Sequence, residues 1–212
     1  MSDVKIVRVQ PTEDYFSLNW QIDIRCNYDC MYCSPEWHDN TSNFKSLEEL
    51  QAAWCNVFDK TKNLNLPYKI SFVGGELTAN KNFLPFVTWL KDNYSEHLFK
   101  LMVTTNGSAS TRYYQKMLEA VDNMAFSLHT EHADEQKFFN MILDLSRNLP
   151  AGKFLQVIIM SEYWNQDRIP MYVKLLEDNN ISYLVNEIDY KYKTREQPIF
   201  FGKFNFEGNI KS

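Results

Sequence analysis

The sequence alternates short apolar runs with amphipathic segments, and this alternation restricts the chain to the α/β class. Six runs rich in β-branched and aromatic residues predict strands, at residues 17–25, 68–74, 98–105, 123–129, 153–160 and 181–188. After the first run, strand follows strand at a spacing of about thirty residues, the length of one βαβ unit. The sequence therefore predicts six parallel strands in a sheet that is either curled or open.

The segments between these runs have the pattern of helices that face a core. Residues 46–60 begin with Ser46 and Glu49, which are spaced as a capping box, and then place apolar residues on one face. The later segments repeat this design. The apolar faces comprise Leu47, Leu50, Trp54, Val57 and Phe58 in the first segment, then Phe83, Val87, Leu90, Tyr113, Met117, Val121, Phe138, Met141, Ile142, Leu145, Ile169, Val173 and Leu176.

Length and charge limit the organisation further. At 212 residues, of which 44% are hydrophobic, the chain is long enough for one substantial core and short for two. We expect residues 1–189 to form a core domain and residues 190–212 to form a tail that packs on it or extends it. The formal net charge of -5, with acidic and basic residues interleaved, argues against a nucleic-acid-binding surface.

No apolar run approaches the roughly 18 residues that a membrane span requires, and no apolar leader segment is present. We therefore expect a soluble cytoplasmic protein. In a reducing compartment, closely spaced cysteines more often bind metal than form disulfides.

The unusual residues of the sequence follow the predicted strands. In parallel α/β sheets and barrels, the loops after the strands converge on one edge and form the site there. The strand ends carry, in order, Cys26, Cys30 and Cys33; Gly74, Gly75 and Glu76; Thr104, Thr105, Asn106 and Gly107; Ser127 and His129; Met160 and Ser161; and Glu187. The sequence thus predicts a single site at this edge.

Cys26, Cys30 and Cys33 offer three soft thiolate ligands on one loop. A structural zinc site is normally closed by four protein ligands, whereas a centre that binds a further molecule keeps one position open. The triad therefore favours a 4Fe-4S cluster with one open iron. The alternative is a structural zinc site completed by a distant histidine or by Cys55, which we interpret as a partly buried packing thiol of the first helix.

The spacing Cys26-x3-Cys30-x2-Cys33, with Tyr32 before the last cysteine, resembles the signature of radical S-adenosylmethionine (radical SAM) enzymes. The stretch FVGGELT resembles the glycine-rich motif of that family, with Leu77 where proline is commonest. The resemblance covers residues 17–189. It implies a partial (β/α)6 TIM-like barrel, a 4Fe-4S cluster and S-adenosylmethionine, which is cleaved reductively to methionine and a deoxyadenosyl radical that abstracts hydrogen from a substrate.

The resemblance also assigns residues to the cofactor. Gly74 and Gly75 would let the backbone approach the methionine moiety, or they would serve a tight turn that needs positive φ. Glu76 would accept hydrogen bonds from the methionyl amine. Tyr32 would lie near the adenine, or it is an ordinary packing aromatic.

Further along the chain, Thr105 and Asn106 would reach the methionyl carboxylate or the ribose, although Asn-Gly also favours a simple turn. Ser127 would touch the cofactor. His129 departs from the Ser-x-Asp of many relatives and is either a catalytic substrate contact or proton donor, or a satisfied histidine at the rim.

Strand alternation adds three residues that the motifs do not mark. It places Gln156 and Met160 beside the cofactor and Glu187 in a catalytic position, with Met160 also fitting a core role.

The resemblance leaves the substrate open as a small organic molecule or a peptide, held in part by the aromatic tail around Phe200, Phe201 and Phe204. An electron donor such as flavodoxin or ferredoxin is implied. The alternatives are an activating enzyme for a glycyl-radical partner and a noncatalytic iron-sulfur or zinc-binding protein.

Overall fold

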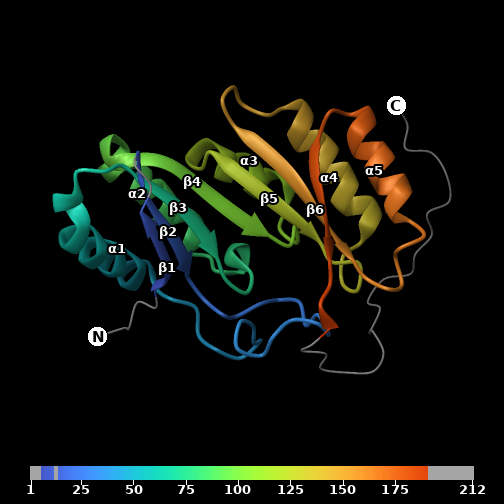
Figure 1. The fold of residues 1–212 in the computed structure, drawn as a ribbon, viewed down its shortest axis with the longest axis horizontal. Coiled ribbons are helices and arrows are strands. Elements are labelled where there is room, and N and C mark those ends of the chain that lie inside the picture. Colours follow the sequence, from blue (N-terminus) through green and yellow to red (C-terminus); the bar gives the residue numbers. More distant parts are fainter. Residues whose placement is uncertain (1–5, 12–13, 191–212) are drawn as a thin grey trace.

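The computed structural model describes residues 6–11 and 14–190, and these form one seven-stranded sheet with helices (Figure 1). The strands lie in the sheet in the same order as in the chain, from β1 to β7. Their bounds are β1 Ile6–Pro11, β2 Phe16–Gln21, β3 Tyr68–Val73, β4 Leu98–Thr105, β5 Asn123–Leu128, β6 Phe154–Ser161 and β7 Ser182–Glu187. Strands β2 to β7 are parallel to one another, which confirms the predicted partial (β/α)6 barrel.

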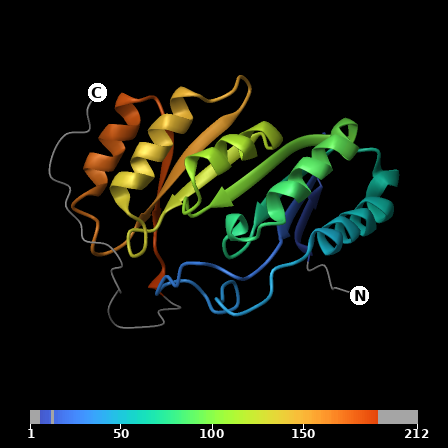
Figure 2. The same ribbon diagram turned by 180° about the vertical axis from the view of Figure 1, so that it is seen from behind.

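The helices cover one face of the sheet, as the two opposite views show (Figures 1 and 2). Right-handed crossovers between sequential parallel strands place every connecting helix on the same side. The bounds are α1 Leu47–Thr61, α2 Phe83–Tyr94, α3 Thr111–Ala120, α4 Glu135–Arg147 and α5 Ile169–Asp178, with 3-10 turns at Lys62–Leu64, Leu77–Ala79 and Ser95–His97. The other face of the sheet is left concave and available for a site.

Helix α1 begins as the sequence predicts. The Ser46 side chain accepts a hydrogen bond from the Glu49 backbone N–H, and the Glu49 carboxylate accepts one from the Ser46 N–H at 2.8 Å. This reciprocal cap satisfies donors that the first turn would leave unpaired. Leu50, Trp54 and Val57 then bury the apolar face of the helix.

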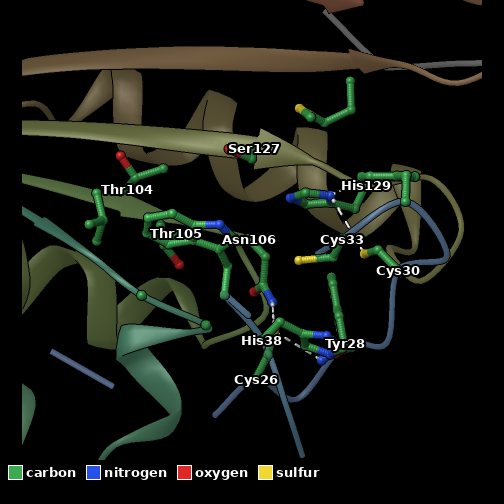
Figure 3. Close-up of a pocket in the computed structure, with 16 residues that line it drawn as sticks. Cys26, Tyr28, Cys30, Cys33, His38, Thr104, Thr105, Asn106, Ser127 and His129 are labelled. Atoms are coloured by element: carbon green, nitrogen blue, oxygen red, sulfur yellow. Dashed lines mark hydrogen bonds between the residues drawn. The ribbon is translucent and has the colours of Figure 1, made fainter. Parts of the chain in front are cut away.

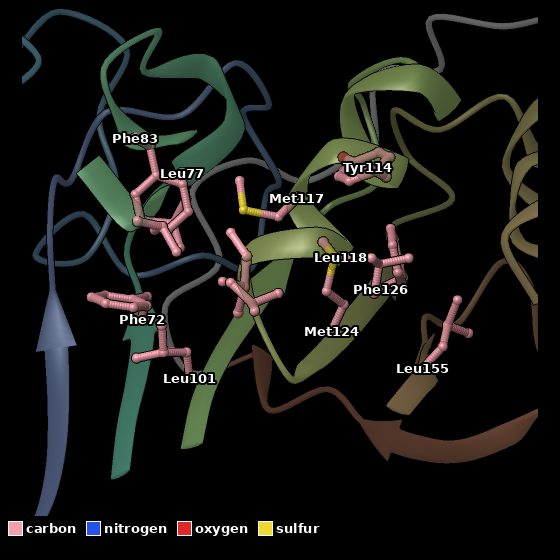
Figure 4. Packing of buried hydrophobic residues seen from close by; sticks show 14 of the residues in the cluster. Phe72, Leu77, Phe83, Leu101, Tyr114, Met117, Leu118, Met124, Phe126 and Leu155 are labelled. Carbon is pink, nitrogen blue, oxygen red and sulfur yellow. The ribbon is translucent and has the colours of Figure 1, made fainter. Parts of the chain in front are cut away.

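One hydrophobic core lies between the helices and the sheet (Figure 4). Alternate residues of strands β2 to β7 point into it, such as Ile70 and Phe72 of β3, which are fully buried. Trp54 of α1 reaches the sheet, where its ring centroid lies 5.1 Å from that of Tyr68. Because the buried set is continuous across all five helices, every βα loop has a rigid support at the same edge of the sheet.

Two details of the strand prediction are wrong. Strand β1 was not expected; it pairs antiparallel with β2 and extends the edge of the sheet. The first predicted strand, 17–25, ends four residues early at Gln21, because the chain leaves the sheet to enter the cysteine loop. The expected tail at 190–212, including Phe200, Phe201 and Phe204, lies outside the described residues except for Tyr190.

Among the described residues, no helix is both long enough and apolar enough to cross a membrane.

Candidate active site

A pocket of about 330 Å³ lies where the parallel strands end (Figure 3). Its volume falls in the range of small-molecule sites, roughly 300–1,000 Å³. The loop after β2 forms one wall, and the ends of β3, β4, β5 and β6 form the others. Eleven of the predicted site residues line it: Cys26, Cys30, Tyr32, Cys33, Gly74, Gly75, Thr105, Asn106, Ser127, His129 and Met160.

The cysteine loop, residues 26–45, is closed at its base by backbone hydrogen bonds. The Cys26 N–H donates to the Asp39 carbonyl at 2.7 Å, and the Asp39 N–H donates to the Ile24 carbonyl at 2.9 Å. The Asp23 carboxylate accepts from the Lys45 N–H at 3.0 Å and from the Asn80 amide at 2.8 Å. These bonds fix both ends of the loop, so its cysteines are presented to the pocket by a defined backbone.

All three cysteines are free thiols that reach the pocket. Burial raises the pKa of Cys26 to about 11 and raises the pKa of Cys30 well above its usual range. Metal ligation requires the thiolate, so a bound metal would replace these protons. No carboxylate is among the described residues that line the pocket, and this soft donor set fits an iron-sulfur cluster.

A second donor group shares one of these cysteines. Ligand atoms of Cys30, Glu131 and His132 lie within 4.8 Å of one another. However, the Glu131 carboxylate accepts the Met31 N–H at 2.9 Å, and the His132 Nε2 accepts the Asp29 N–H at 3.3 Å. These atoms already position the backbone of the cysteine loop, so the three thiols are the better ligand set.

Gly74 and Gly75 are explained by close backbone packing. A Cβ at Gly74 would lie 2.4 Å from the Asp23 carbonyl oxygen, and one at Gly75 would lie 2.3 Å from the Arg25 carbonyl oxygen. Neither glycine has a positive φ in this turn. The turn therefore needs glycine in order to pack beneath the start of the cysteine loop, and not because of its dihedral angles.

Glu76 does not line the pocket; it lies behind the pocket wall and is buried. Its Oε1 accepts from the Thr78 N–H, from the Thr78 hydroxyl and from the Thr105 hydroxyl at 2.7 Å. Its Oε2 accepts from the Asn106 N–H at 2.6 Å. With both oxygens occupied by the protein, Glu76 positions Thr105 and Asn106 rather than offering a free carboxylate to the methionyl amine.

Asn106 connects this wall to the cysteine loop. Its side-chain amide donates to the Asn27 side chain at 3.0 Å and lies 3.9 Å from the Cys26 sulfur. A series of contacts, from Glu76 to Asn106 to Cys26, therefore connects the core to the first cysteine.

His129 lies beside Cys30 on the opposite wall (Figure 3), with 3.7 Å between Nδ1 and the sulfur. Nδ1 also lies 2.6 Å from the Tyr32 hydroxyl, which donates to the Glu162 carboxylate at 2.8 Å. Burial lowers the pKa of His129 to about 4, so its imidazole is neutral at neutral pH. Burial raises the pKa of Glu162 to about 7, although hydrogen bonds from Thr130 and Tyr32 oppose this shift.

The structure does not bring two other predicted residues to the pocket. Glu187 is exposed near the end of the edge strand β7, on the side of the strand opposite to its concave-face neighbour Asn186. Gln156 does face the concave side but lies lower on β6, where its amide contacts the Ser182 hydroxyl at 3.3 Å. Strand alternation places Gln156 on the concave face, but it does not show that Gln156 lies too far from the C-terminal end of β6 to reach the pocket.

Several pocket residues were missed from the sequence. Tyr28, Trp37 and His38 of the cysteine loop line the pocket, and Glu162 supports it from behind. The signal for Glu162 was present, because it directly follows a parallel strand as the marked residues do. The loop residues had no such signal, since their placement depends on how the loop folds back.

The chain is similar to several characterised enzymes. It is 32% identical over 209 residues to GTP 3',8-cyclase of Pasteurella multocida, which covers 92% of this chain and 59% of that enzyme. It is 32% identical over 93 residues to an S-adenosylmethionine-dependent nucleotide dehydratase of Selenomonas ruminantium, covering 44% of this chain and 30% of the relative. The chain thus spans about three fifths of the cyclase and less of the dehydratase. No model of a protein family matches the sequence.

Among solved structures, SuiB of Streptococcus suis has the same fold, with a TM-score of 0.60 at 15% identity over 87% of this chain and 42% of SuiB. The cyclase and the dehydratase are radical SAM enzymes, and this chain aligns with them while carrying the three-cysteine loop at the end of its first parallel strand. The chain is therefore a member of the radical SAM superfamily.

Proposed function

We propose that this chain binds a 4Fe-4S cluster through Cys26, Cys30 and Cys33 and cleaves S-adenosylmethionine reductively. Held by these three thiolates, the cluster would supply the one electron needed to break a carbon–sulfur bond of the sulfonium, which would give methionine and a deoxyadenosyl radical able to take a hydrogen atom from an organic substrate. A one-electron donor such as flavodoxin or ferredoxin would re-reduce the cluster. The observation that carries this proposal is the convergence of three free thiols on one pocket without a competing carboxylate.

The residues around the pocket divide into two groups. Thr104, Thr105 and Asn106 would hold polar groups of S-adenosylmethionine, since they lie next to the glycine turn and to Cys26. Across the pocket, Ser127 and Met160 would contact the adenosyl group. Glu76 supports the first group from behind through its bonds to Thr105 and Asn106.

His129 is the proposed substrate-side residue. Its imidazole is neutral, and its Nδ1 is occupied by Tyr32, so Nε2 is the ring nitrogen left for a substrate. The relatives act, by their names, on GTP and on a nucleotide, which makes nucleotides the first substrates to test. A glycyl-radical partner and a noncatalytic metal-binding role have no comparable support.

The test is product formation without substrate. Reconstituted protein, incubated anaerobically with dithionite and S-adenosylmethionine, is expected to release deoxyadenosine slowly, because cleavage needs only the cluster and the cofactor. Cys30→Ala is the matched inactive control, and Cys55→Ala is the active one. Absence of deoxyadenosine from protein with an intact cluster would favour the noncatalytic alternative.

A further inference from the structure

The concave face of the sheet extends from the pocket toward the other end of the strands, and a small separate cavity of about 90 Å³ lies on it below the pocket, lined by Ser71, Met102 and Gln156 among others. Because Tyr68, Ile70 and Phe72 of β3 are buried against the helices, the alternate residues of the strand face the concave side. The register carries this alternation across the parallel strands. The row nearest the pocket is Gln21, Val73, Thr104, Ala125, Gln156 and Ser182, and the row below it is Asn19, Ser71, Met102, Asn123 and Phe154.

The charged strand residues on this face have one sign. Strands β2 to β7 contain two basic residues, Lys69 and Lys100, which are register partners and both face the concave side. The single carboxylate within these strands, that of Glu187, faces away from the concave side. Neither lysine forms an ion pair within the described part of the chain, although the Lys69 ammonium lies 5.1 Å from the ring centroid of Tyr15. In a protein of net charge -5, the strand residues of this face thus carry only these two positive charges.

An unpaired donor lies on the same face. The side-chain nitrogen of Gln21 is buried and has no hydrogen-bond partner among the described residues. Gln21 is the register partner of Val73, which lines the pocket. A buried donor without an acceptor costs about 1–3 kcal/mol, so a ligand that draws the Gln21 side chain out of this buried position and accepts from it would recover that cost.

These features define the ligand. We propose that the concave face binds a polar substrate that carries a phosphate or carboxylate group, with the anionic end at Lys69 and Lys100 and an acceptor group at Gln21. Val73 and Lys69 are four residues apart, or ~13 Å along the strand. The reactive carbon, held beside Ser127 and His129, would therefore be separated from the anionic end by roughly this length.

The other candidate occupant is the chain's own segment 191–212. That segment contains five basic and two acidic residues by sequence (Lys191, Lys193, Arg195, Lys203 and Lys211 against Glu196 and Glu207). A basic segment would not complement two lysines that form no ion pair among the described residues, so charge favours an external anion.

The inference rests on the proposed function only for the position of the reactive carbon, and binding tests it without turnover. Ribose 5-phosphate, glutarate and uncharged ribose are titrated by saturation-transfer NMR into reconstituted protein loaded with S-adenosylmethionine. The variant is Lys69→Met with Lys100→Met, and the matched control is Lys60→Met with Lys116→Met, both exposed on helices.

We expect at least one anion to bind the wild type and the control. We expect the Lys69→Met, Lys100→Met double variant, called the inner-face variant below, to bind that anion with an affinity at least about tenfold lower. The anion that binds more tightly identifies the group as phosphate or carboxylate. Equal affinity in all three proteins, or equal binding of ribose, would overturn the inference. Failure of both anions to bind the wild type would also overturn it and assign the face to another occupant, such as segment 191–212.

Deoxyadenosine formation without substrate separates this inference from the proposed function. The inner-face variant is expected to keep that activity, because its lysines lie two register rows below the row that borders the pocket. If the wild type forms no deoxyadenosine, this result counts against the proposed function, whatever the anion titration shows.

Discussion

The hydroxyl of Tyr32 lies 2.6 Å from Nδ1 of His129, so the residue before the last cysteine is joined directly to the end of β5. The same hydroxyl donates to Glu162 in the loop after β6. Three segments far apart in the sequence therefore meet at one oxygen atom. This junction is one of the contacts that hold the cysteine loop over the sheet.

Tyr32→Phe tests the junction, because it keeps the ring and removes only the hydroxyl. Glu162 and His129 each lose a partner in a buried site, so we expect the free energy of unfolding to fall by about 1–3 kcal/mol in denaturant titrations. Tyr183→Phe is the matched control, since its hydroxyl donates to Glu177 at the surface. Equal losses in the two variants would show that the Tyr32 junction contributes nothing special.

Glu162 predicts a pH dependence of stability. Its pKa is about 7 in the folded protein, against an ordinary value of 4.5. Between these values the folded state keeps a proton that the unfolded state releases, so the free energy of unfolding falls as pH rises through this window and levels off above it. The full effect is about 3 kcal/mol.

Glu162→Gln removes this titration and can keep the contacts. The amide oxygen can accept from Thr130 while the amide nitrogen donates to the Tyr32 oxygen, which leaves the Tyr32 hydroxyl to donate to His129. Chemical denaturation of the metal-free protein from pH 4.5 to 8 should therefore show a flatter profile than the wild type. Exposed Glu119→Gln is the control, and a wild-type slope in Glu162→Gln would contradict the assignment.

Glu76 separates a positioning role from direct cofactor binding. In Glu76→Gln, the amide nitrogen must face at least one of the N–H and O–H donors that now surround the carboxylate. We expect the metal-free protein to lose about 1–3 kcal/mol of stability before any cofactor is added. A variant as stable as the wild type, but with weak S-adenosylmethionine binding, would restore the direct role.

The cysteines give the prediction on metal content. Replacing Cys26, Cys30 or Cys33 with alanine should abolish iron binding after anaerobic reconstitution, whereas Cys55→Ala should leave the iron content unchanged. Cys55 lies on α1, where its sulfur contacts the Tyr94 hydroxyl at 3.5 Å. Iron loss in Cys55→Ala equal to that in the triad variants would mean four protein ligands and no open iron.

The fold could be predicted from the hydrophobic periodicity of the strands and helices, and the position of the site from the residues that follow the strands. Six parallel strands, the Ser46 cap and the residues after each strand could be predicted, because each depends on local pattern and on the rule that parallel strands end at one edge. Glu76 could not be placed, since a carboxylate after a strand can turn into the pocket or into the core. The junction at Tyr32 depends on loop packing that no local pattern encodes.

Edge effects explain the other misses. Strand β1 is added outside the repeating βαβ pattern, so its antiparallel pairing has no periodic signal. Glu187 ends the last strand, where the sheet has no further neighbour to fix which residues face a site.

The most direct measurement is an electron paramagnetic resonance spectrum of the reduced, reconstituted protein with and without S-adenosylmethionine, supported by iron, sulfide and zinc content. We expect a 4Fe-4S signal that changes when S-adenosylmethionine is added, because three cysteines leave one iron open to it. A spectrum that S-adenosylmethionine leaves unchanged, or protein that retains zinc instead of iron, would contradict an open iron held by Cys26, Cys30 and Cys33.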